Sequence, residues 1–282
     1  VMVSATSAVS GHGEIAYGNA IGSVICNTAL IAAITIAVRP GKVERRSLGL
    51  PVAFFFAAAA IYSVVAYASG EFTRPVGIVL LLIFVAYIAL TVRSALSARK
   101  AATADLPDVQ QDAGAGDGSA EAEAEMPMLR AVILLIIGAA LIAVGANLLV
   151  DNGTKIAAAL GVPESVIALT FVALGTSLPE LVTAITSLVK GHGSLSLGNI
   201  VGANLFNLVL VSGVSVTLSP FAIPCEKTVC GMNASLVVDI PLMFAVMAIM
   251  TLPALIRGKL SRFQGILLLA IYAAFCVFQF VA

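Results

Sequence analysis

Glu180 is the residue whose position is hardest to explain by packing alone. It lies inside an apolar segment, residues 163–189, that is long enough to span a membrane. A carboxylate at that depth is costly and indicates a function. Small and hydroxyl side chains recur around it at spacings of three and four residues and so share one helix face: Ala173, Thr176, Ser177, Thr183 and Ser187. A carboxylate and hydroxyls together suit a hard cation that has lost its water.

Pro179 falls within the same predicted helix. It removes one backbone donor and crowds the carbonyl of Gly175, which predicts a free carbonyl oxygen one turn from Glu180. The alternative is a polar stripe that holds neighbouring helices together. That alternative accounts for the hydroxyl groups but not for the carboxylate, so the segment favours a cation site.

An internal repeat organises the chain around this segment. Residues Val1–Asn27 align without gaps onto Leu181–Asn207 at an offset of 180, and ten of the 27 pairs are identical. Two copies of one polar unit indicate a transporter built from structural repeats, with its site at their interface. The offset puts the partner of Glu180 just before Val1. We therefore expect a Glu there, after a Pro and a Gly-Thr-Ser-like triplet, and we expect the 282-residue form to exchange ions poorly.

The two copies also carry a family resemblance. The motifs GTSLPEL, GNIVGANLFN and GNAIGSVICN resemble the alpha repeats of the sodium/calcium exchanger (cation/calcium antiporter) family, and the resemblance covers almost the whole chain. It implies ten membrane helices in two inverted halves that exchange Na⁺ or H⁺ for Ca²⁺. The ion ligands that it implies are Ala173, Thr176, Ser177, Glu180, Ser23, Asn27 and Asn207. Two positions depart from the family pattern: Ala203 replaces a usual serine, and Asn207 stands where several members have Asp.

Composition places the chain in the membrane. Apolar residues make up 60% of the sequence, charged residues 11%, and the mean hydropathy is +1.07, too little polar surface for a soluble domain. We predict an all-α polytopic membrane protein with the inverted-repeat exchanger fold and about nine of its ten helices. The predicted segments are 1–10, 15–38, 48–68, 76–97, 129–150, 163–189, 195–218, 234–255 and 263–282.

A hydrophilic break divides these segments into halves. We predict a first repeat half at 1–98, an acidic cytoplasmic linker at 99–127 and a second repeat half at 128–282. If the linker is cytoplasmic, twelve of the fifteen Lys and Arg residues lie on that side, as the positive-inside rule requires. The same orientation makes the two copies run in opposite directions through the membrane.

Several further residues are weaker candidates. For Asn19 and Asn199, an ion ligand and a helix–helix contact are equally good interpretations. Asp239 lies inside a predicted span and could line an aqueous entrance or bond a freed backbone group. Glu14 and Glu164 are expected to cap helices or face water, and His12 and His192 to be turn residues kept by duplication. Cys225 and Cys230 share one loop, and the sequence does not decide whether they pair.

These features predict a secondary active antiporter that exchanges Ca²⁺ for Na⁺ by alternating access. H⁺/Ca²⁺ and K⁺-dependent exchange stay open, and a non-transporting scaffold and an intramembrane hydrolase are the alternatives of another class. We expect no enzyme activity and no cofactor apart from the transported ions. The lipid bilayer is the expected partner and nucleic acid is not, while the sequence does not indicate an oligomeric state. The expected location is a prokaryotic inner membrane, with several passes.

Overall fold

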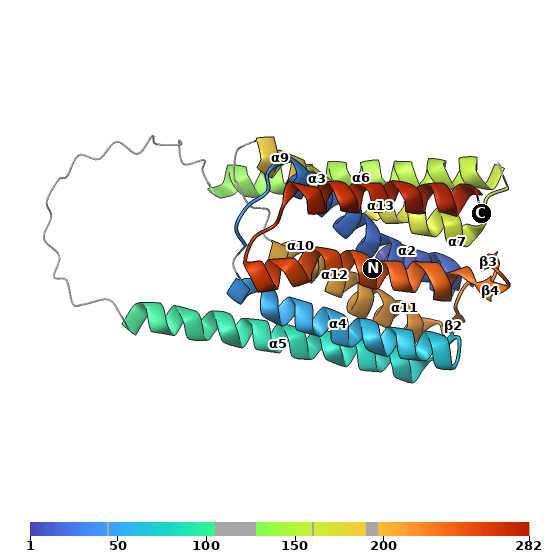
Figure 1. Ribbon diagram of the computed structural model, residues 1–282, viewed down its shortest axis with the longest axis horizontal. Coiled ribbons are helices and arrows are strands. Elements are labelled where there is room, and N and C mark those ends of the chain that lie inside the picture. The colour runs from blue at the N-terminus through green and yellow to red at the C-terminus, as the bar shows by residue number, and fades with distance from the viewer. Residues whose placement is uncertain (44, 105–127, 160, 190–196, 282) are drawn as a thin grey trace, which may run out of the picture.

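The computed structural model describes residues 1–43, 45–104, 128–159, 161–189 and 197–281, which form a bundle of helices (Figure 1). In the first half the helices are α1 (Met2–Val9), α2 (Gly13–Cys26), the π-helix η1 (Asn27–Ala32), α3 (Ala33–Val38), α4 (Arg45–Ala68) and α5 (Arg74–Ala104). In the second half they begin with α6 (Met128–Ala159), α7 (Glu164–Ile167), the π-helix η2 (Ala168–Val172), α8 (Ala173–Thr176) and α9 (Leu178–Val189). They continue with α10 (Leu197–Phe206), the π-helix η3 (Asn207–Val211), α11 (Ser212–Leu218), the π-helix η4 (Ser235–Asp239), α12 (Ile240–Arg257) and α13 (Arg262–Val281).

Among the described residues, six helical stretches are long and apolar enough to cross a membrane: Gly13–Val38, Leu48–Ala68, Arg74–Ser97, Leu197–Leu218, Ser235–Arg257 and Arg262–Val281. A seventh span results if the pair Glu164–Thr176 and Leu178–Val189, bent by 48°, is counted as one. Of the two other predicted segments, 129–150 lies within α6 and 1–10 contains α1. Helices are the expected solution because hydrocarbon offers no hydrogen-bond partner to a free backbone group.

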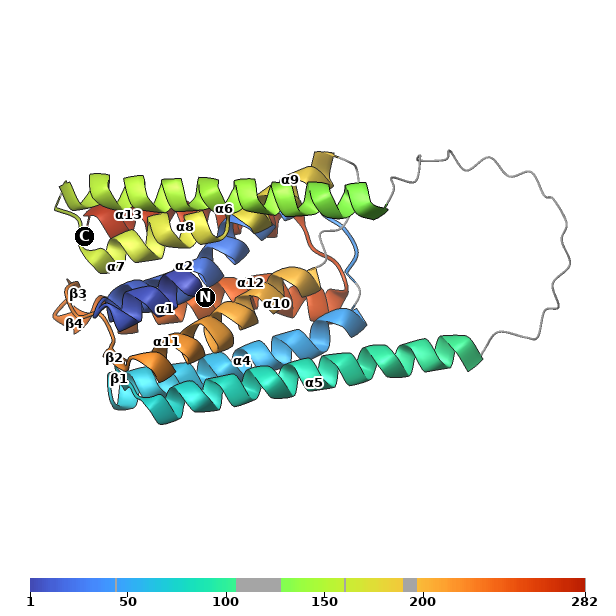
Figure 2. The ribbon, with the colours of Figure 1, turned by 180° about the vertical axis from the view of Figure 1, so that it is seen from behind.

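The two long helices α5 and α6 run along opposite sides of the bundle (Figures 1 and 2). Both expose large apolar side chains, such as Leu82 at 62% and Leu135 at 73%, as expected of surfaces that face lipid. Between them, one hydrophobic core joins α2, α4, α10 and α12 with Tyr17, Phe55, Leu205 and Met247 among its members. The helices of the two halves therefore share a core. The division of the chain at 99–127 stays a prediction, and residues 105–127 lie outside the described part.

Short extended segments, which the all-helical prediction did not include, lie at both ends of the bundle, and at each end one pairing joins the two halves. At one end, β1 (Glu71–Phe72) pairs in antiparallel fashion with β2 (Phe221–Ala222), and β3 (Thr228–Val229) pairs with β4 (Met232–Asn233). At the other end, which we call the linker end because α5 finishes and α6 starts there (Figure 1), Lys42 and Lys259 form an antiparallel bridge.

Candidate functional site

The span that contains Glu180 is broken. Helix α8 ends at Thr176, Ser177 adopts a non-helical conformation, and α9 begins at Leu178, so the single helix predicted over 163–189 is interrupted. The free carbonyl predicted at Gly175 is also wrong, because that oxygen accepts a backbone N–H bond at the end of α8. Pro179 explains both corrections: it lies in the first turn of α9, where its missing N–H would have had no helical partner. Glu180 therefore sits in the first turn of a half-helix, where the helix dipole favours a negative charge.

Two glycines allow α2 to pack directly against this broken span. A Cβ added at Gly18 would come within 2.5 Å of the Ala168 Cβ, and one added at Gly22 within 2.5 Å of the Leu169 carbonyl oxygen and 2.8 Å of the Ala173 Cβ. Glycines four residues apart allow this close approach of two helices. The two backbones consequently bring polar side chains of α2 into direct contact with those of α8.

A chain of hydroxyl and amide groups crosses this contact. The Thr176 hydroxyl donates to Asn19 Oδ1 at 2.7 Å and lies 3.3 Å from the Ser23 hydroxyl. Asn19 Nδ2 donates in turn to the Ser4 hydroxyl of α1 at 2.7 Å. Ser23 and Thr176, both predicted as ligands, are thus brought together. Asn19, for which the sequence left two interpretations, positions Thr176 in this structure. Ser4 had no signal in the sequence, because its repeat partner is Ala184.

Two buried polar groups beside this chain have no hydrogen-bond partner among the described residues. Neither amide atom of Asn27 is bonded, although the residue is only 1% exposed, and Glu180 Oε2 is likewise buried and unbonded. Both belong to contacting elements, because η1 packs against α9. The thiol of Cys26, the residue before Asn27, is near the Glu180 carboxyl and in contact with the Ser177 hydroxyl. Buried polar atoms without partners are rare and call for an explanation.

The second repeat copy reproduces the backbone of the first. The π-helix η1 begins at Asn27 and η3 begins at Asn207, so the offset of 180 holds for the backbone as well as for the sequence. Single-turn π-helices are common at functional sites. Asn207 itself is half-buried. Ala203, at the position of Ser23, brings no polar atom.

Two further predicted ligands, Ala173 and Ser177, lie close to Thr176 and Cys26, whereas Thr183 does not. The Ala173 carbonyl accepts bonds from the Thr176 hydroxyl at 3.2 Å and the Ser177 amide at 3.1 Å. Ser177 is 2% exposed and faces Cys26. Thr183, expected on the same face as Thr176, is instead exposed and donates to the Pro179 carbonyl of its own helix. The bend at Ser177 is the reason, since it turns α9 away from the face of α8.

Other candidates have local partners. The buried Asp239 accepts a bond from Gln279 Nε2 at 2.9 Å, which fits neither an aqueous entrance nor a freed backbone group. The Lys227 ammonium donates to the Phe278 and Gln279 carbonyls, and burial lowers its pKa while the Asp239 carboxylate opposes that shift. Glu164 pairs with the His12 ring at 2.9 Å rather than standing alone at a helix end. Cys225 and Cys230 are both free and exposed, and His192 lies outside the described residues.

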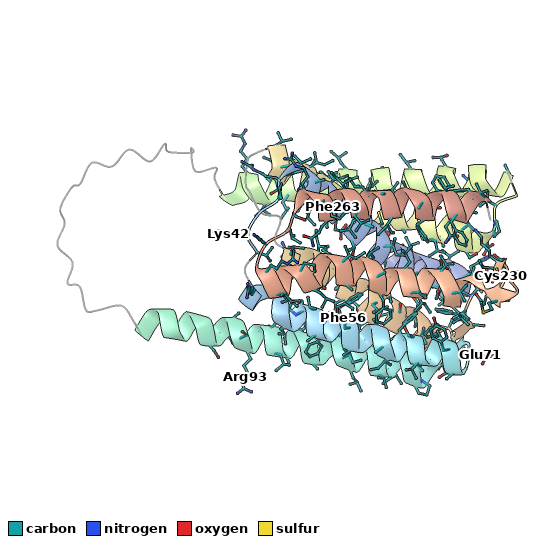
Figure 3. The ribbon with its side chains drawn as sticks, viewed as in Figure 1. Lys42, Phe56, Glu71, Arg93, Cys230 and Phe263 are labelled. Atoms are coloured by element: carbon teal, nitrogen blue, oxygen red, sulfur yellow. The ribbon has the colours of Figure 1, made fainter. Side chains whose placement is uncertain are left out.

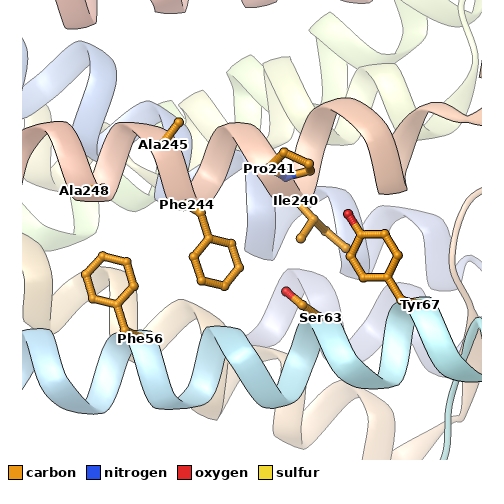
Figure 4. Close-up of a pocket in the computed structure, with 8 residues that line it drawn as sticks. All are labelled: Phe56, Ser63, Tyr67, Ile240, Pro241, Phe244, Ala245 and Ala248. Carbon is orange, nitrogen blue, oxygen red and sulfur yellow. The ribbon is translucent and has the colours of Figure 1, made fainter.

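An apolar cleft of about 480 Å³ lies elsewhere, between α4 and α12 (Figure 4). Its described lining residues include two hydroxyl side chains, Ser63 and Tyr67, but no carboxylate that could balance the charge of a cation. Within the described residues no group of three or more His, Cys, Asp or Glu side chains could hold a metal. A cation near Glu180 would depend on hydroxyl, amide and carbonyl oxygens, which are ligands that Ca²⁺ accepts.

Known proteins match this chain over nearly its full length. The family model described as sodium/calcium exchanger protein matches residues 1–93 and 130–281. The chain belongs to the sodium/calcium exchanger family. The putative antiporter CaxA of Alkalimonas amylolytica is 31% identical, over 99% of this chain and 82% of CaxA. The inner membrane protein YrbG of Escherichia coli is 32% identical, over 78% of this chain and 65% of its own length.

Solved structures lead to the same family. The sodium-calcium exchanger NCX_Mj, soaked with Na⁺ and Sr²⁺, matches 100% of this chain and 82% of its own, with a TM-score of 0.68 and 28% identity. The predicted helical exchanger fold and family are confirmed. At the level of the family, the predicted sodium/calcium antiport and the multi-pass inner-membrane location are confirmed too. The residue roles are tested by none of these similarities.

Proposed function

We propose that this protein exchanges Na⁺ for Ca²⁺ at one site between α2–η1 and α8–α9. The observation that carries the proposal is the pair of unbonded buried groups, Glu180 Oε2 and the Asn27 amide, next to the Ser23–Thr176 contact. Leaving such atoms unpaired costs about 1–3 kcal/mol each. A cation that binds there recovers this cost, because it replaces its lost water with these oxygens.

The ligand set includes Glu180, Thr176, Ser177, Ala173, Asn27, Ser23 and Asn207. Ca²⁺ takes six to eight oxygen ligands. Na⁺ carries one charge instead of two and needs fewer negative ligands. Because both ions bind oxygen, they compete for overlapping positions. The single carboxylate of the described site balances one Na⁺ but only half of the charge of Ca²⁺. Occupation by Na⁺ therefore drives Ca²⁺ off, and a Na⁺ gradient supplies the free energy for Ca²⁺ movement.

Alternating access follows from the inverted repeats. Related halves of such a transporter rock against each other around a fixed site near the middle of the membrane. The break at Ser177 and the π-helices η1 and η3 supply irregular backbone at that depth, where it is tolerated only if it faces protein or a cavity. The solved structures of NCX_Mj, soaked with Na⁺ together with Ca²⁺ or Sr²⁺, support both ions as substrates of the family.

The decisive experiment is ion flux with the purified protein in liposomes. We expect Ca²⁺ uptake driven by internal Na⁺, slow in the 282-residue form as the sequence predicts, and we expect Glu180→Gln to reduce it by about a further hundredfold or more, because the loss of a buried counter-charge costs about 3–5 kcal/mol. The exposed carboxylate of Glu71, far from the site at the end opposite the linker (Figure 3), provides the control. Glu71→Gln should keep the wild-type rate, and a Glu180→Gln protein that exchanges normally would refute the site.

The same liposomes also distinguish the possible counter-ions and test whether the protein transports ions at all. Internal Na⁺, K⁺ or an acid interior is supplied in turn, and the ion that drives Ca²⁺ uptake is the counter-ion. The absence of Ca²⁺ movement with all three would favour the non-transporting scaffold. An intramembrane hydrolase is not favoured, because Glu180 Oε2 has no hydrogen-bonded partner among the described residues that could act as a second catalytic group.

A further inference from the structure

A cluster of basic residues at the linker end is not used by ion exchange. The loop between α3 and α4 and the loop between α12 and α13 come from different halves of the chain, yet their backbones are hydrogen-bonded to each other. Val43 N donates to the Gly258 carbonyl at 2.9 Å, and Leu260 N donates to the Gly41 carbonyl at 3.0 Å. These two bonds flank the bridge between Lys42 and Lys259. We call this pair of joined loops the basic bridge.

The basic bridge sets like charges against each other. Lys42 and Lys259 are direct partners in an antiparallel bridge, an arrangement in which like charges destabilise the pairing. Arg45 lies over Gly258, since a Cβ added there would come within 2.8 Å of the arginine Nε. Arg262 Nη2 reaches the Val38 carbonyl at the end of α3. Four cationic side chains thus converge from both halves.

The described residues provide no negative charge to balance them. None of the basic residues in the two loops forms an ion pair with a described acidic side chain; they are Arg39, Lys42, Arg45, Arg257, Lys259 and Arg262, all exposed. In the sequence, residues 39–46 and 257–262 together contain seven Lys or Arg and one acidic residue, Glu44, which lies outside the described part. Among the residues that the structure describes, nothing relieves the repulsion between these loops.

The positive-inside rule accounts for the number of these charges but not for their placement. Orientation in the membrane needs Lys and Arg anywhere near the ends of the spans, as with Arg93 on α5, which points away from the bundle at some distance from Lys42 (Figure 3). It does not need two lysines paired across hydrogen-bonded loops. The loops follow α3 and α12 and precede α4 and α13, all of which belong to membrane-spanning stretches, so the basic bridge lies at the level of the lipid headgroups.

We propose that the basic bridge binds the phosphate group of an anionic phospholipid, which sits between Lys42 and Lys259 and joins the two halves of the protein. Lys binds phosphate as a point charge, and Arg binds it through two parallel N–H bonds. The phosphate removes the repulsion between the paired lysines and adds attraction to both loops. An anionic lipid of the facing leaflet supplies this group at high local concentration.

The test compares two double variants that remove equal charge from the linker end. Lys42→Gln with Lys259→Gln, called the bridge variant, removes the two paired charges of the basic bridge. Arg93→Gln with Arg130→Gln, the control variant, removes two exposed charges on α5 and α6. Each protein is placed in phosphatidylcholine bilayers with or without phosphatidylglycerol, and the retained phosphatidylglycerol is counted by native mass spectrometry. We expect retention to fall about 25-fold in the bridge variant, roughly five-fold per charge, and less than two-fold in the control variant.

The melting temperature gives a second readout, in which the order of the wild type and the bridge variant depends on the lipid. In pure phosphatidylcholine the bridge variant should melt at or above the wild-type temperature, because it has lost a repulsion. Adding phosphatidylglycerol should raise the melting temperature of the wild type and not that of the bridge variant. Lys42→Arg with Lys259→Arg should respond as the wild type does. This pattern also shows that the bridge variant folds.

Four outcomes would overturn the proposal. Equal lipid loss in both double variants would indicate only a general surface potential, and no loss in either would indicate a topology signal alone. If inorganic phosphate in detergent reproduced the whole stabilisation, the ligand would be a soluble anion and not a lipid. If a variant with the acidic residues of 105–127 replaced by Gln retained several-fold more phosphatidylglycerol than the wild type, that segment would be the occupant of the basic bridge.

Discussion

The stretches 18–32 and 198–212, which run from the two repeat copies into their π-helices, begin those π-helices at equivalent asparagines but lie in different surroundings. In the first copy, Gly22 packs against the backbone of Leu169, whereas among the described residues a Cβ added at Gly202 would meet only the Tyr87 hydroxyl, at 3.7 Å. Asn19 is 2% exposed and bonded on both sides, but its partner Asn199 is exposed. Duplicated sequence has thus produced equivalent backbones with unequal packing.

The inequality has a direct consequence for the site. The first copy faces the helix break that carries Glu180, and its polar atoms turn toward Thr176. The second copy directs Asn204, which replaces Val24, at Thr28 of the first copy, with a bond of 2.8 Å. One copy therefore contributes oxygens near the carboxylate, and the other anchors the two copies to each other. The comparison teaches that repeat position alone does not fix a side chain's role.

The largest expected difference between the copies is in stability. Gly22→Ala should lower the free energy of unfolding by about 1–3 kcal/mol, because the new methyl group must displace the Leu169 carbonyl. Gly202→Ala should change it by less than about 0.5 kcal/mol, since that position is open. Circular dichroism during thermal denaturation in detergent measures both. Equal losses would mean that the second copy is packed as tightly as the first.

A smaller difference is expected in ion affinity. Asn207→Asp adds a carboxylate beside the proposed site, which should tighten Ca²⁺ binding about tenfold and Na⁺ binding less, because the added attraction scales with the charge of the ion. Asn199→Asp places the same charge on an exposed position of α10 and serves as the control. Calorimetric titration of both ions measures the effect. A Ca²⁺ affinity that does not change in Asn207→Asp would place Asn207 outside the ligand set.

Most of the fold followed from hydrophobic segment length and the repeat, because a membrane permits few solutions for an apolar chain. The break at Ser177 could not be predicted from Pro179, because a proline permits either a kinked helix with a free carbonyl or a new helix start. Contacts across the bundle decide between them. The pairing of Lys42 with Lys259 was equally invisible, since it joins loops that are 217 positions apart.

Within the site, residue types were easier to predict than roles. Ser23 and Thr176 were proposed from motif positions and do meet, at 3.3 Å. Asn19 stayed ambiguous because an amide serves equally well as ligand and as positioning group until its partners are known. Thr183 was misplaced for a geometric reason: spacings of three and four residues define one face only while the helix is unbroken.

The smallest expected effect distinguishes a broken span from a continuous one. Thr176→Val removes the hydroxyl that bonds Asn19 Oδ1 and contacts Ser23, with little change of shape. Thr183→Val removes a hydroxyl that bonds only within α9. A hydrogen bond contributes about 1 kcal/mol, so Ca²⁺ affinity should fall about five-fold in Thr176→Val and less than two-fold in Thr183→Val. Titration of the two proteins under identical conditions makes the comparison. If both substitutions weaken binding equally, the hydroxyls form one continuous face toward the ion, as an unbroken helix would require, and the bend at Ser177 closes when the site is occupied.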